Sequence, residues 1–189
     1  ALLAARDAVA DTQPGLTLYK DFRVLFEAER ELDAVLIATP DHGHAVQAAW
    51  AMAQGCHVFM EPPLAHSLAE TEALTREARR RGVALWMGDE PATRPAFRRA
   101  VTLLRAGIIG AVTEIHAWTA RPVWPQGGGR PEGSDPVPPE LDWELWLCGA
   151  PPRPFKQRVY HRYNWRGWHD FGGGALGDIG CRLLSLPFR

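Results

Sequence analysis

Cysteine is scarce in this sequence, and its few cysteines show no pairing pattern. Only Cys56, Cys148 and Cys181 occur in 189 residues, and none belongs to a C-x-x-C pair. An odd and widely spaced set argues against a disulfide framework and is typical of a reducing compartment. We therefore expect a cytoplasmic protein.

The sequence also lacks a strong net charge and long apolar runs. The formal net charge is −1, which does not favour a nucleic-acid partner. No apolar run approaches the ~18 residues of a membrane span, so no membrane partner is expected. The N-terminus shows no signal peptide and no initiating methionine, so upstream sequence, with any export signal, is expected to be missing. Hydrophobic residues make up 46% of the chain, enough for a packed core.

The first half of the chain alternates short apolar segments with helical ones. Residues 33–40, 57–60 and 83–88 are predicted strands, and residues 44–55 and 67–82 are predicted helices between them. The second helix begins with a capping box and ends in three arginines before a glycine. This order predicts a doubly wound parallel sheet with helices on both faces. Upstream, residues 2–10 and 22–32 are expected to be helices around an extended segment at 16–19.

The second half has a different character. Residues 94–107 predict a helix with proline in its first turn, and residues 111–120 alternate like a half-buried strand. An irregular, proline-rich stretch fills 121–140, and a loop of that length is usually functional or disordered. A short helix is predicted at 141–149. Residues 163–186 combine aromatic residues, glycines and one acid before a final helix.

Two short patterns suggest ligand contacts, each beside a plainer interpretation. "GGGALG" (172–177) matches G-x-G-x-x-G, but it follows no strand, so a glycine-rich entry to a helix is favoured. His42 and His44 in "PDHGH" lack a nearby third partner for a metal. They are expected in the turn after a strand, either meeting a ligand or simply solvated. Asp178 follows Gly177 near a predicted helix start, so N-capping is its plainer role.

Several segments share one register with a known family. "DAVLIATPDHGHA", "HVFMEPPLAHSLAE", "RPAFRRAVTLLRAGIIGAVTEIHAWT" and "GGGALGDIGC" resemble the Gfo/Idh/MocA oxidoreductases, typified by glucose-fructose oxidoreductase and inositol dehydrogenase. Members have an N-terminal Rossmann domain and a C-terminal α/β domain with an open sheet, which carries substrate and often an oligomer interface. The resemblance implies an α/β fold: a partial Rossmann-type doubly wound parallel sheet over residues 1–90, then part of the substrate domain over 91–189.

The same resemblance implies an activity and its residues. Family members transfer hydride between NAD or NADP and a sugar or cyclitol carbon, and we expect the intact protein to form a homo-oligomer. The residues implied along the cofactor and the active site are Thr39, Pro40, His42, His44, Glu61, Trp165 and Arg166. Asp178 would be one of the polar active-site residues.

Two departures from the family pattern fall on catalytic positions. The family has E-K-P where this chain has Glu61-Pro62-Pro63, so the lysine that holds the substrate hydroxyl is replaced by Pro62. The family's G-D-x-G-x-H ends here in Arg182, which stays protonated near neutrality. The first βαβ segment and the last large sheet are also missing. The sequence therefore predicts a fragment with a degenerate catalytic site. Alternatives are a non-catalytic binding or scaffold protein and a relative of the NAD-dependent glycosidases.

Overall fold

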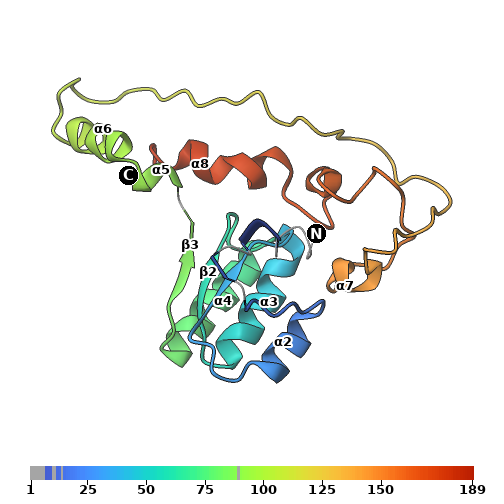
Figure 1. The fold of residues 1–189 in the computed structure, drawn as a ribbon. Coiled ribbons are helices and arrows are strands. Elements are labelled where there is room, and N and C mark those ends of the chain that lie inside the picture. Colours follow the sequence, from blue (N-terminus) through green and yellow to red (C-terminus); the bar gives the residue numbers. More distant parts are fainter. Residues whose placement is uncertain (1–6, 10–11, 14, 89) are drawn as a thin grey trace.

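A three-stranded parallel sheet organises the first half of the protein. The computed structural model describes all residues except 1–6, 10–11, 14 and 89 (Figure 1). Its strands are β1 (Ala34–Ile37), β2 (His57–Met60) and β3 (Leu85–Met87), in the order β1-β2-β3. The register pairs Ile37 with Met60 and Met60 with Met87. The predicted parallel sheet is confirmed.

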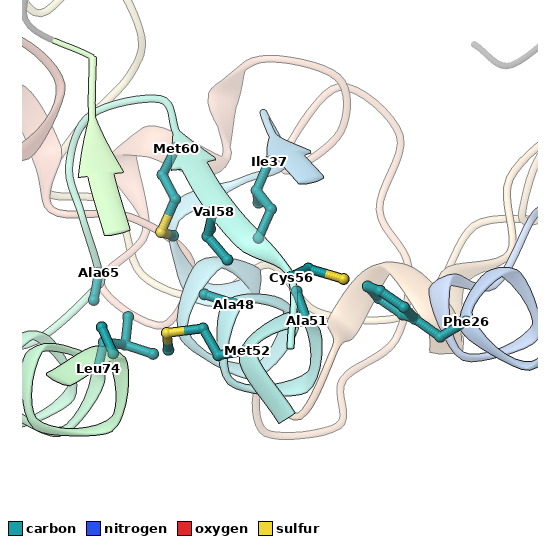
Figure 2. Packing of buried hydrophobic residues seen from close by; sticks show 11 residues of the cluster. Phe26, Ile37, Ala48, Ala51, Met52, Cys56, Val58, Met60, Ala65 and Leu74 are labelled. Atoms are coloured by element: carbon teal, nitrogen blue, oxygen red, sulfur yellow. The ribbon is translucent and has the colours of Figure 1, made fainter. Parts of the chain in front are cut away.

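Two helices cover one face of this sheet. These are α3 (Asp41–Ala53) and α4 (Leu68–Arg81). The buried side chains of Val58 and Met60 pack against Met52 of α3 and Leu74 of α4 (Figure 2). The predicted capping box of α4 is present, and Gly82 ends the helix in the left-handed conformation, with φ 69°. Glycine suits that position because a Cβ would be strained there.

The opposite face of the sheet is open within the described residues. Leu36, Phe59 and Trp86 are paired neighbours on successive strands, so they form one row across this face. Their side chains are 66%, 38% and 65% exposed. Strand residues alternate between the two faces of a sheet. In these strands the positions that face away from α3 and α4 also carry large hydrophobic residues, so the open face has an apolar row.

The segment before the sheet is only partly helical. Helix α2 (Phe22–Ala28) ends earlier than the predicted 22–32. Its Phe22 ring packs edge-on against Trp50 of α3, with 5.8 Å between the ring centroids. The predicted helix at 2–10 lies mostly outside the described residues, although 7–9 are helical. Residues 16–19 are in neither helix nor strand.

Short helices and an aromatic cluster make up the second half. The cluster consists of Trp143, Leu147, Phe155, Tyr160, Trp165 and Phe171. The helices are α5 (Glu90–Thr93), α6 (Pro95–Arg105), α7 (Trp143–Leu147), η1 (Asn164–Gly167), the π-helix η2 (Leu176–Gly180) and α8 (Cys181–Leu184). Figure 1 shows the C-terminal segment lying beyond the carboxyl ends of the strands. None of the helices in the described ranges is long and apolar enough to cross a bilayer.

The predicted strand at 111–120 is wrong. These residues are extended but make no ladder, and Ile115 and Trp118 are 57% and 81% exposed. The segment between α6 and α7 instead crosses the molecule as an irregular chain (Figure 1). Alternation of apolar and polar residues suits a strand only where a neighbouring strand supplies hydrogen bonds, and no described segment lies beside this one to do so.

Candidate functional site

His44 fixes the ends of the first two strands to one another. Its Nδ1 lies 2.8 Å from the carbonyl oxygen of Pro63, and its Nε2 lies 2.8 Å from that of Thr39. The side chain is almost fully buried. His44 therefore joins the segment after β1 to the segment after β2, the two places where the sequence predicted cofactor contacts.

The prediction that His42 and His44 lie in a turn is wrong. Both belong to the first turn of α3, which begins at Asp41 directly after Pro40. Proline fixes its own φ and so suits a helix start, while an acid in the first turn suits the helix dipole. Burial in this turn, rather than solvation, is the environment of both imidazoles.

Asp41 and His42 attach the second half of the chain to these strand ends. The His42 backbone N–H donates to the carbonyl oxygen of Phe171 at 3.2 Å, and its ring nitrogens face the carbonyl oxygens of Phe171 and Trp146 at 3.3 and 3.0 Å. The Gly173 N–H donates to Asp41 Oδ2 at 3.2 Å. Burial lowers the pKa of His42 and raises that of Asp41. Both ring nitrogens of His42 face backbone carbonyl oxygens, and the neutral ring can donate to only one of them.

The segment after β2 carries an open carboxylate and two prolines. The Glu61 backbone N–H donates to the Ile37 carbonyl oxygen at 2.9 Å, which extends the ladder by one bond. The side chain of Glu61 is exposed, and Pro62 and Pro63 are half-buried. Proline at position 62 has no cationic or donor group, so this segment offers a ligand only the carboxylate and backbone carbonyl oxygens.

Asp178 lies between two arginines. Arg121 Nη1 donates to Asp178 Oδ2 at 2.8 Å and to Tyr163 Oη at 3.0 Å. Arg166 Nε donates to the other oxygen, Oδ1, at 2.9 Å. The Arg166 guanidinium also lies 4.3 Å from the ring centroid of the buried Trp165. Asp178 is inside η2, so the N-cap interpretation is wrong and its carboxylate is an ion-pair partner.

Arg121 is the site residue that the sequence did not reveal. It follows the segment mispredicted as a strand and reaches Asp178 from 57 positions away. No local pattern marks it, because its role depends on how the long irregular segment crosses the molecule. Arg182, which the sequence did single out, is half-buried in α8, and its Nε is buried without a hydrogen-bond partner.

The glycines of "GGGALG" serve close packing. A Cβ at Gly172 would lie 2.9 Å from the Trp165 ring, and one at Gly173 would lie 3.0 Å from Gly177 Cα. A Cβ at Gly177 would stand 3.6 Å from Asp41 Oδ2. The segment leads into a helix and follows no strand, as the glycine-rich-entry interpretation predicted. It brings the helix of Asp178 against the start of α3.

Two further observations bear on metals and protons. In the described ranges, no group of three or more histidine, cysteine, aspartate or glutamate side chains is placed to hold a metal ion.

The ring centroid of His66, shortly after the two prolines, lies 5.8 Å from that of His169. This pair brings a second set of titratable groups to the junction between the strand ends and the Asp178 helix.

Comparison with known proteins gives matches over both halves. Residues 3–89 match a family model described as oxidoreductase family, NAD-binding Rossmann fold, and residues 104–186 match one described as oxidoreductase family, C-terminal α/β domain. Among curated proteins, the uncharacterized oxidoreductase YrbE of Bacillus subtilis is 28% identical over 95% of this chain and 52% of its own length. The scyllo-inositol 2-dehydrogenase (NAD⁺) of the same organism is 30% identical over 56% of this chain and 28% of its own length.

A solved structure matches as well. A 3-ketoreductase from Actinomadura kijaniata, in complex with TDP-benzene and NADP, has a TM-score of 0.51 and 27% identity, covering 58% of this chain and 34% of that one. The chain therefore spans about half the length, or less, of the proteins it matches.

Proposed function

Because this chain belongs to the Gfo/Idh/MocA oxidoreductase family, we propose that it is part of an enzyme that transfers hydride between NAD or NADP and a sugar or cyclitol CH–OH group. The observation that carries the proposal is the position of Asp178. Its helix packs against the start of α3, where the Gly173 N–H bonds Asp41 Oδ2. An acid from the second half is thereby brought towards the carboxyl ends of the strands, where open α/β sheets bind ligands.

The residues at the strand ends fit a nucleotide cofactor. Thr39 and Glu61 are exposed there, and a carboxylate such as Glu61 can accept hydrogen bonds from ribose hydroxyls. Thr39, Pro40 and His44 would hold the cofactor beside β1, with His44 acting through the backbone that it fixes. When bound, a nicotinamide supplies the hydride acceptor or donor. We place the boundary between the cofactor and substrate domains near residue 90.

The substrate side of the proposed site is built by the second half. Trp165 and Arg166 would line it, and Asp178 would accept a hydrogen bond from a substrate hydroxyl. Pro62 and Arg182 leave it without the lysine and histidine that the family uses for the hydroxyl proton. We therefore propose that neutral sugars and cyclitols are oxidised slowly.

Replacing Asp178 tests this proposal. In the full-length protein, Asp178→Asn is expected to lower the rate of NAD(P)H formation with myo-inositol and neutral sugars by about 10²-fold, since a group that contacts the reacting hydroxyl is removed. The measurement is the absorbance of reduced nicotinamide under steady-state conditions, with thermal unfolding as a check on folding.

A matched control is available in the same half of the chain. Asp135 pairs with Lys156 at 2.9 Å and makes no contact with the Asp178 group. Asp135→Asn is expected to leave the rate within about twofold of the unchanged protein, because it removes a partly exposed ion pair and keeps an amide oxygen that can accept from the Gln157 N–H. Equal rates for the unchanged protein and Asp178→Asn would refute the proposed role.

A further inference from the structure

Arginines contact Asp178, and two buried N–H groups in the neighbouring segments lack a hydrogen-bond partner. Its two carboxylate oxygens already accept from Arg121 and Arg166. Arg182 follows Asp178 by four residues, in α8 directly after the π-helix η2, and its buried Nε has no hydrogen-bond partner. The buried indole Nε1 of Trp124, whose ring packs edge-on against Tyr163, has no partner either. One donor on the helix that follows Asp178 and one beside Tyr163 are thus left without an acceptor.

The arginines keep donors that face solvent. A guanidinium group has five N–H donors, and the hydrogen bonds described here use Nη1 of Arg121 and Nε and Nη1 of Arg166. The two side chains are 38% and 24% exposed. Asp41 also acts on Arg166 electrostatically, but its carboxylate is buried and accepts from the Gly173 N–H. A ligand can therefore approach guanidinium groups that Asp178 satisfies only in part.

A neutral sugar is a poor match for such a group of side chains. Each sugar hydroxyl brings a donor as well as an acceptor, whereas a carboxylate or phosphate brings only acceptors. Arginine pairs with these oxyanions through two parallel N–H···O bonds, and it holds its charge at any physiological pH. Replacement of the family histidine by Arg182 adds a permanent positive charge at the position where the family needs a titrating group.

We propose that Arg121, Arg166 and Arg182 form a binding site for an oxyanion carried by the substrate, either a carboxylate or a phosphate on a sugar or cyclitol. This inference rests on the proposed function and names the substrate class of the same site. In it, Arg182 binds substrate charge in place of moving a proton, and Asp178 holds the two other guanidinium groups in position.

Binding of matched sugars to the full-length protein tests the inference. D-Glucuronate and D-glucose share a pyranose ring and differ in having a carboxylate or a hydroxymethyl group at the last carbon, and D-glucose 6-phosphate is the phosphate counterpart. By calorimetry, at least one of the two anionic sugars is expected to bind about tenfold or more tightly than glucose. The difference should shrink as salt is raised. Which anion binds more tightly identifies the oxyanion.

Variants then locate the site. Arg182→Gln and Arg121→Gln are each expected to weaken binding of the preferred anion by about tenfold to a hundredfold, and to weaken binding of glucose much less. Arg130→Gln is the control, because Arg130 is 61% exposed and pairs with Asp170 instead. The inference is overturned if glucose binds as tightly as both anions, or if Arg130→Gln weakens anion binding as much as the other two variants.

The outcomes separate this inference from the proposed function. Preferential binding of an anionic sugar without any NAD(P)H formation would support the oxyanion site and count against the dehydrogenase. Oxidation of neutral sugars without a preference for anions would support the dehydrogenase and count against the oxyanion site.

Discussion

Pro62→Lys combined with Arg182→His is expected to raise NAD(P)H formation from myo-inositol by about 10²–10⁴-fold, the usual contribution of general acid–base catalysis. The first change supplies a cation directly after Glu61, beside the segment that His44 fixes. The second replaces a permanently protonated group with one that titrates near neutrality. The experiment uses a protein in which this chain is completed with flanking sequence from a full-length relative.

Single variants and a matched histidine control make this result specific. Either change alone should recover much less than the pair, because two groups on one proton path do not contribute additively. Arg130→His introduces the same residue at an exposed arginine that pairs with Asp170, and it should leave the rate unchanged. A completed protein that is already fast with Pro62 and Arg182 in place would contradict the degenerate-site hypothesis. His169 or Asp178 would then be the candidates for the proton carrier.

Phe171→Ala is expected to lower the free energy of unfolding by about 3–5 kcal/mol, the cost of truncating a buried aromatic residue. The Phe171 side chain is 0% exposed, and its ring centroid lies 4.9 Å from that of Trp146 and 5.1 Å from that of His42. The Arg153 guanidinium lies 4.5 Å from the same ring centroid. Truncation would leave a cavity where the aromatic cluster meets the start of α3. Guanidinium chloride unfolding, followed by tryptophan fluorescence, measures the loss.

The same substitution at an exposed position is the control. Phe188 is 84% exposed, so Phe188→Ala should change the free energy of unfolding by no more than about 0.5 kcal/mol. Similar losses for the two variants would mean that Phe171 is not the centre of the cluster. A large loss for Phe171→Ala alone would confirm that packing around Phe171 stabilises the protein.

The sheet and its helices were predictable because their signals are local. Ser67 and Glu70 form the capping box that the sequence predicted. Gly82 ends α4 in the left-handed conformation, which glycine adopts more readily than other residues do. The three strands are short apolar runs spaced by helical segments, a pattern that a parallel sheet requires. The family resemblance assigns Glu61 and Asp178 to one site, and this assignment stays a prediction.

The failures concern features that depend on distant partners. Residues 111–120 alternate like a strand, but alternation does not specify a neighbouring strand. His42 was predicted in a turn, whereas carbonyl oxygens of Trp146 and Phe171, more than 100 positions away, surround its ring in a buried helix start. Arg121 was not predicted as a site residue for the same reason, since only the path of the irregular segment brings it to Asp178.

Transfer of deuterium tests the central claim most directly. The full-length protein is incubated with NAD⁺ or NADP⁺ and carbon-deuterated myo-inositol or glucuronate, and the reduced nicotinamide is analysed by mass spectrometry. If the site performs hydride transfer, the reduced nicotinamide carries deuterium from the substrate carbon, however slow the turnover, and Asp178→Asn lowers the rate at which this labelled nicotinamide forms. Reduced nicotinamide without label, or no reduced nicotinamide from any sugar or cyclitol, would contradict the account.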